Sequence, residues 1–196
     1  MPATLDVVLA EAARLGHLGG DSVAAHIEHG RRFLQALPAD TRRVLDLGSG
    51  GGIPGLVLAL DRPEWEFVLL DRRAQRTDYL RRAVGRLGVD NVEVVTGEAS
   101  TLAFHVKHRG RYDAVVARSF GPPAATSEAA AGFLRLGGVL VVSEPPDPDE
   151  GRWPAEGLAL LGLALDDPTI DGLRRLRAVT ACPGEFPRRR LRPPLF

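Results

Sequence analysis

The sequence predicts an α/β fold in which helices cover both faces of a doubly wound, mostly parallel seven-stranded sheet. Short, wholly apolar segments alternate with segments of helical periodicity, and apolar strands are typical of a parallel sheet buried on both faces. The first apolar segment also leads directly into a glycine-rich turn and a helix, as such folds commonly begin. The 196 residues suffice for one domain with its own core, and we see no internal repeat and no second domain.

Two amphipathic helices are expected in the first 40 residues, ahead of the sheet. They cover residues 4–16 and 22–37. Ser22 can cap the start of the second helix, and Pro38 ends it. The predicted fold therefore carries N-terminal helices in addition to its repeating strand–helix units.

The sheet and its crossover helices are expected within residues 41–182. The expected strands are residues 44–47, 65–70, 92–95, 113–117, 139–142, 163–165 and 176–181. The expected helices are residues 55–60, 73–87, 123–134 and 155–161. The repeated strand–helix units predict that the first five strands are parallel, and right-handed crossovers then make the sheet doubly wound. The last two strands fit an antiparallel pair at the sheet edge. Prolines and arginines in residues 183–196 predict an extended basic tail, so that one domain covers residues 1–196.

Composition excludes several classes of protein. The single cysteine, Cys182, rules out an internal disulfide framework and a cysteine-built metal site. His26 and His29 lie three residues apart, but we interpret them as part of a polar helix face and expect no metal. No apolar segment approaches the roughly 20 residues that span a bilayer, and no signal peptide is evident. We therefore expect a cytoplasmic protein without a membrane partner.

The formal net charge is zero, but the charge is unevenly distributed. Arginines concentrate in residues 72–86 and 174–192, and residues 144–171 between them are acidic. A local basic patch can bind an anionic partner in a neutral protein. An arginine-rich genome composition is the alternative explanation.

The glycine-rich turn after the first strand fits two ligand classes. Residues 50–55 match the dinucleotide fingerprint G-x-G-x-x-G, and residues 46–52 match the S-adenosylmethionine (AdoMet) pattern. Asp46 favours AdoMet, because a carboxylate at this position suits its cationic methionine end and would repel a pyrophosphate. An NAD(P)-dependent oxidoreductase remains the alternative.

Acids at the ends of the next two strands extend the predicted cofactor site. Asp71 can accept hydrogen bonds from both ribose hydroxyls, although it could instead cap the following helix. Glu98 could lie near the adenine, although it could be an ordinary turn residue. The complete set expected to bind AdoMet is Asp46, Gly48, Ser49, Gly50, Gly52, Pro54, Asp71, Arg72, Glu98, Ala99 and Arg118.

Two segments carry a resemblance to one bacterial family. They are residues 46–55, with their Pro-Gly ending, and Ala117-Arg118 at the end of the fourth strand. The family is the small-subunit rRNA guanine-N7 methyltransferase family, RsmG or GidB. Further similar segments are Leu69-Leu70-Asp71, residues 91–99 and Phe186-Pro187-Arg188-Arg189. The resemblance spans roughly residues 22–190. It implies a class I, Rossmann-like methyltransferase fold, AdoMet as methyl donor, and 16S rRNA or the small ribosomal subunit as partner.

The implied reaction is methyl transfer to guanine N7. This nitrogen has an available lone pair, so the protein needs to align the reactants and needs no general base. Arg118 is expected to position the substrate through guanine O6 or a phosphate; an ion pair with Asp71 or Glu98 is the alternative. The tail residues Arg188, Arg189 and Arg190 are expected to bind the RNA backbone.

Two departures from the family pattern keep other functions open. The family usually has lysines where this chain has Gln75 and Ser143-Glu144. A methyltransferase acting on a small molecule or another RNA fits that loss of positive charge. A non-catalytic RNA-binding or scaffold protein that retains the fold is a further alternative.

Overall fold

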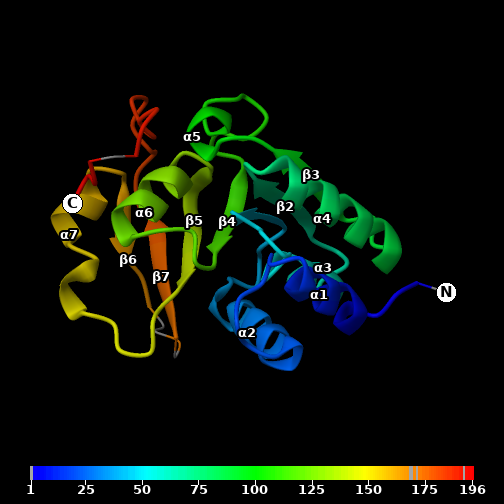
Figure 1. Cartoon of the computed structure of the whole chain (residues 1–196). Helices are drawn as coiled ribbons and strands as arrows, with labels where there is room; N and C mark the ends of the chain where they lie inside the picture. The colour runs from blue at the N-terminus through cyan, green and yellow to red at the C-terminus, as the bar shows by residue number, and fades with distance from the viewer. Residues whose placement is uncertain (1, 168–169, 171, 192) are drawn as a thin grey trace.

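A seven-stranded sheet forms the middle layer of the structure, a computed structural model that describes residues 2–167, 170, 172–191 and 193–196 (Figure 1). The strand order is β3-β2-β1-β4-β5-β7-β6. The strands are β1 Arg43–Leu47, β2 Glu66–Asp71, β3 Val92–Thr96, β4 Tyr112–Ala117, β5 Leu134–Ser143, β6 Leu163–Leu165 and β7 Leu173–Ala178. The first five strands are parallel, and β7 is antiparallel to β5 and β6, which confirms the predicted fold class.

Helices cover both faces of this sheet (Figure 1). They are α1 Leu5–Arg14, α2 Val23–Ala36, α3 Gly55–Asp61, α4 Ala74–Leu87, α5 Ala99–Leu102, α6 Pro123–Ala131, α7 Ala155–Ala159 and the 3₁₀ helix η1 Glu150–Arg152. Successive residues of a strand point to opposite faces. Val44 thus packs in a cluster with α2 and α3, and Leu45 packs in a second cluster with α6 and α7. Each face has its own apolar core.

The N-terminal helices lie over α3 and α4 on one face. Tyr79 of α4 donates its hydroxyl proton to the carbonyl of Val8 in α1 at 2.7 Å. His26 of α2 is buried, and its Nε2 lies 2.9 Å from the carbonyl oxygen of Gly19. Our interpretation of His26 as part of a polar helix face was therefore wrong, because its ring fastens the α1–α2 loop. In the described part of the chain, no helix is long and apolar enough to span a bilayer.

Three predicted boundaries are corrected. The helix predicted to run to Leu134 ends at Ala131, because Leu134 already pairs with Tyr112 at the start of β5. β5 therefore begins earlier than the predicted residue 139. β7 covers Leu173–Ala178 rather than 176–181, because its pairing with β5 begins at Leu173 opposite Ser143. The short helices α5 and η1 were not predicted, since four or three residues show no periodicity.

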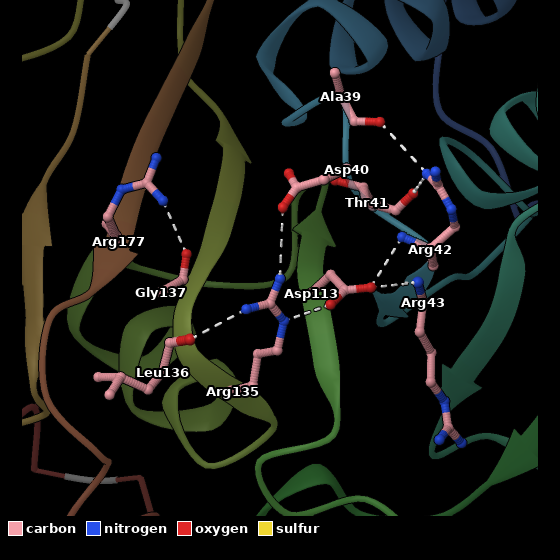
Figure 2. Close-up of polar contacts among 10 residues, drawn as sticks. All are labelled: Ala39, Asp40, Thr41, Arg42, Arg43, Asp113, Arg135, Leu136, Gly137 and Arg177. Carbon is pink, nitrogen blue, oxygen red and sulfur yellow. Dashed lines mark hydrogen bonds and ion pairs between the residues drawn. The ribbon is translucent and has the colours of Figure 1, made fainter.

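The edge at which the parallel strands begin is held together by one acid (Figure 2). Oδ2 of Asp113 accepts hydrogen bonds from the backbone N–H groups of Arg42 and Arg43 at 2.9 and 2.7 Å. Its other oxygen pairs with Arg135, which also reaches Asp40 at 3.9 Å. Burial alone would raise the pKa of Asp113, but these hydrogen bonds bring it below its usual value. The acid thereby fixes the start of β1 against β4 and β5.

After β7 the chain folds back along α6 as a tail without regular secondary structure in its described residues. The guanidinium of Arg109 donates to the carbonyls of Cys182, Pro183 and Phe186 at 2.9–3.0 Å. Arg188 forms a two-pronged ion pair with Glu128, whose side chain is fully buried in α6. These contacts bring Arg189 and Arg190 to the opposite edge of the sheet, where the parallel strands end.

Candidate active site

The glycine-rich turn joins β1 to α3 at the point where the strand order reverses, the usual ligand position in such sheets. The N–H groups of Gly48 and Ser49 donate to the carbonyl of Leu70 at 2.8 and 2.9 Å, which ties the turn to β2. Gly48 has φ = 76°, and a Cβ there would lie 2.7 Å from the ring of Phe120. Only glycine fits this position, so the turn and the Phe120 ring form one closely packed wall.

Asp46 is buried beneath this turn with one oxygen unused. Its side chain is 1% exposed, and Oδ2 accepts the N–H of Gly55 at 2.9 Å. A Cβ on Gly55 would lie 2.5 Å from the same oxygen, so glycine is also required there. Oδ1 has no hydrogen-bond partner among the described residues. Burial raises the pKa of Asp46 to about 7, although the Gly55 N–H opposes that shift.

Arg118 follows the end of β4, two residues beyond the Val116 that lies opposite Asp46. Its Nη1 is buried and finds no hydrogen-bond partner in the described part of the chain. Burial lowers the pKa of Arg118, while the charges of Asp21 and Asp46 oppose that shift. Burial and the charge of Arg118 together lower the pKa of His29 on α2. The site therefore holds a carboxyl group and a guanidinium that interact electrostatically, and each keeps a buried polar atom without a hydrogen-bond partner in the described chain.

Asp71 and Glu98, the two alternative ion-pair partners expected for Arg118, each pair with a different arginine. Asp71 pairs with Arg76 at 3.3 Å, and Glu98 pairs with Arg72 at 3.5 Å. Asp71 also accepts the N–H of Gly50 at 3.0 Å and that of Arg73 at 2.9 Å. It therefore holds both the glycine turn and the turn into α4, and its carboxylate is almost fully occupied by the protein.

A cavity of about 980 Å³ opens at the ends of β1 to β4. Among the predicted cofactor residues, its lining includes Gly48, Asp71, Arg72, Glu98 and Ala99. The other predicted residues, Asp46, Ser49, Gly50, Gly52, Pro54 and Arg118, lie outside this lining. Ser49 has a structural contact here, since its hydroxyl donates to the carbonyl of Asp46 at 2.8 Å. The predicted site thus separates into a cavity wall and the turn that supports it.

The structure adds residues that the sequence analysis did not assign to the site. The loop after β4 contributes Ser119, Phe120, Gly121 and Pro122 to the cavity wall. The signal available in the sequence was an aromatic residue between the end of a strand and a double proline. The tail contributes Arg189 and Arg190 to the rim, whereas Arg188, also predicted to bind RNA, is engaged with Glu128.

Comparison with known proteins assigns the chain to a family. The model of the family GidB, described as rRNA small subunit methyltransferase G, matches residues 23–144, more than half of the chain. The chain belongs to this family. A relative named ribosomal RNA small subunit methyltransferase G from Deinococcus radiodurans is 41% identical over 108 residues, 55% of this chain and 43% of that protein. Its namesake from Deinococcus deserti is 36% identical over 157 residues, 75% of this chain and 64% of the relative.

The chain therefore spans between about two fifths and two thirds of the length of these relatives. Solved structures of other proteins resemble this chain in fold. A SAM-dependent O-methyltransferase from Thermotoga maritima matches with a TM-score of 0.59 at 12% identity, over 88% of this chain and 71% of that one. At such low identity, the likeness concerns the arrangement of the sheet and helices.

Proposed function

We propose that this chain is an AdoMet-dependent methyltransferase that acts on guanine N7 of 16S rRNA. Family membership supports the reaction class, and the proteins it matches carry a name that specifies small-subunit rRNA. When bound, AdoMet supplies an electrophilic methyl group on a positively charged sulfur. The residues of the chain then have to hold that donor, admit the base and align the two.

The pair of unsatisfied groups beside the glycine turn carries the proposal. Oδ1 of Asp46 is a buried acceptor without a donor, and Nη1 of Arg118 is a buried donor without an acceptor. Leaving both unpaired costs free energy, about 1–3 kcal/mol for each group. The amino-acid end of AdoMet offers an ammonium and a carboxylate, which satisfy Asp46 and Arg118 together when that end of the donor extends beyond the cavity lining to the glycine turn. A nicotinamide dinucleotide would bring a pyrophosphate to the same turn.

The rim of the cavity supports an anionic acceptor. Arg73, Arg189 and Arg190 line the cavity and form no ion pair with any residue that the structure describes. AdoMet is itself a cation and does not need these charges. Unpaired arginines beside a methyl-donor site suit the phosphates of a nucleic acid.

Two measurements test the proposed function. In calorimetric titrations, S-adenosylhomocysteine should bind and NAD should not. Labelled AdoMet should then transfer methyl groups to naked 16S rRNA or to assembled 30S subunits, and the product should be 7-methylguanosine. Transfer to small phenols but to neither RNA substrate would contradict the assigned acceptor. Binding of NAD in preference to S-adenosylhomocysteine would contradict the reaction class.

A further inference from the structure

A second cavity lies beside the first, across the loop that follows β4. Its volume is about 390 Å³, near the lower end of the range for small-molecule sites. The segment Ser119–Gly121 lines both cavities, so the two cavities adjoin along this loop. The remaining lining comes from Pro123 at the start of α6, from residues 142–145 at and after the end of β5, and from Arg152 and Trp153. The volume of this second cavity suits one planar base rather than a stretch of nucleic acid.

The shared wall combines an aromatic ring with backbone strain. Phe120 is half-buried, and its ring packs on Gly48 of the glycine turn. Ser119 has φ = 54°, a left-handed conformation that is unfavourable for a residue with a side chain. Aromatic rings are the usual stacking surface for an unpaired base. The strained turn therefore presents Phe120 at the boundary between the two cavities.

The polar end of the second cavity is a buried carboxylate. The Glu144 side chain is 3% exposed, and its Oε1 accepts the indole N–H of Trp153 at 2.6 Å. Its Oε2 forms an ion pair with Nε of Arg152 at 3.4 Å, without a hydrogen bond between the two atoms. An ionised carboxylate accepts hydrogen bonds and cannot donate them. Oε2 of Glu144 can still accept a hydrogen bond. A ligand that approaches it must offer N–H groups.

We propose that this second cavity receives the acceptor base and that in this chain Glu144, which lies in the segment where the family usually has a lysine, makes the cavity specific for guanine. Guanine carries two neighbouring donors, N1–H and the N2 amino group, on the edge remote from N7. With that edge at Glu144, N7 is directed back toward Phe120 and the first cavity. Adenine has an unprotonated N1 and cannot offer the same pair. Because enzymes that modify a base take it out of the stack, one unpaired nucleotide would enter here.

This inference rests on the proposed function, and the first test uses the unaltered protein. The substrate is an RNA oligonucleotide copied from the 16S rRNA segment that contains the methylated guanosine, with that nucleotide as guanosine, inosine or adenosine. Inosine retains N7 and N1–H but lacks the N2 amino group. We expect kcat/KM for inosine to fall about tenfold or more relative to guanosine, and adenosine to be inactive. Equal rates for guanosine and inosine would overturn the role of Glu144.

The second test uses Glu144→Gln, which replaces one oxygen by an amide that donates. We expect this variant to lose about 10- to 100-fold in kcat/KM for guanosine, to lose much less for inosine, and to bind S-adenosylhomocysteine as the wild type does. Glu156→Gln, on the exposed surface of α7, is the matched control. If Glu144→Gln keeps the wild-type ratio of guanosine to inosine, the assignment is wrong. If Glu144→Gln does not fold, the inosine result with the wild type decides alone. Absence of methyl transfer to any RNA by the wild type would overturn the proposed function and this subsite with it.

Discussion

Two aspartates on neighbouring strands are used in opposite ways at the two edges of the sheet. Asp113, at the start of β4, accepts two backbone hydrogen bonds and pairs with Arg135 (Figure 2). Asp46, near the end of β1, keeps one oxygen without a partner. Their pKa values move in opposite directions, below the usual range for Asp113 and up to about 7 for Asp46.

The difference separates an acid that stabilises the fold from an acid that is available to a ligand. At the starting edge of the strands, the hydrogen-bonding capacity of Asp113 is filled by the protein itself. At the ligand edge, Asp46 and Arg118 each retain a buried polar atom without a partner. Buried polar groups are rarely left unsatisfied, and two such groups that interact with each other at the edge where these sheets bind ligands suit a ligand that completes both.

The largest effect is expected for Arg118→Ala. Removal of the guanidinium that is proposed to hold the carboxylate of AdoMet should weaken binding of S-adenosylhomocysteine about tenfold or more and lower the rate of methyl transfer by about 10²–10³-fold. Rapid-quench measurement of methyl transfer and calorimetry give the two values. Arg118→Lys, which keeps the charge but not the planar fork, should recover part of kcat. Wild-type turnover in Arg118→Ala would contradict the role assigned to Arg118 in the site.

A large effect on stability, without an effect on ligand binding, is expected for Asp113→Ala. The substitution leaves two backbone N–H groups and Arg135 without their acceptor, and the free energy of unfolding should fall by about 3 kcal/mol. Urea denaturation measures that loss. The control is Asp61→Ala, which removes a surface ion pair with Arg31 and should cost less than about 1 kcal/mol. Equal losses in the two variants would refute the structural role assigned to Asp113.

A smaller effect is expected when the two tail arginines are removed together. Arg189→Ala/Arg190→Ala should weaken RNA binding about twentyfold at 0.1 M salt and reduce the salt dependence of log K by about 1.4. The matched control, Lys107→Ala/Arg111→Ala, removes two positive charges from the exposed loop before β4. Filter binding at several salt concentrations gives both slopes. If the two double variants have the same slope, the tail does not contact phosphates.

The smallest effect is a dependence of ligand affinity on pH. Burial raises the pKa of Asp46 to about 7, so its carboxyl group is mostly neutral at pH 6 and mostly ionised at pH 8. An ammonium binds the ionised form better, and the affinity for S-adenosylhomocysteine should therefore rise about tenfold over this range. Titrations in buffers of different ionisation enthalpy should show proton release near pH 6. A flat pH profile would separate Asp46 from the ligand.

Most of the sheet could be predicted because its signals are local. Apolar runs identify the strands, and the glycine turn between Asp46 and Pro54 identifies the ligand edge. The error at Leu134 has a different origin. Its position depends on pairing with Tyr112 in another strand, and no local pattern reports that contact. The same holds for His26, whose partner Gly19 lies in the preceding loop.

The site residues divide in the same way, into those that a local pattern identifies and those that depend on contacts between distant segments. The sequence identified the acids at strand ends, and the structure places Asp71 and Glu98 at the cavity. The sequence could not reveal that Arg188 pairs with a glutamate in α6, because that contact joins residues 60 positions apart. Nor could it assign Phe120, which becomes important only because its ring packs on Gly48.

The most direct test compares Asp46→Asn and Asp113→Asn with the wild type by calorimetric titration of S-adenosylhomocysteine at pH 8. Asp46→Asn should bind at least about tenfold more weakly than the wild type, since a charge-assisted hydrogen bond to the ammonium is lost. The folded-state pKa of Asp46 exceeds its ordinary value, so the ionised carboxylate disfavours folding at this pH. The melting temperature of unliganded Asp46→Asn should therefore not fall. Asp113→Asn should bind as the wild type does. Wild-type affinity in Asp46→Asn, or an equal loss in Asp113→Asn, would contradict the division between a structural and a ligand-binding acid.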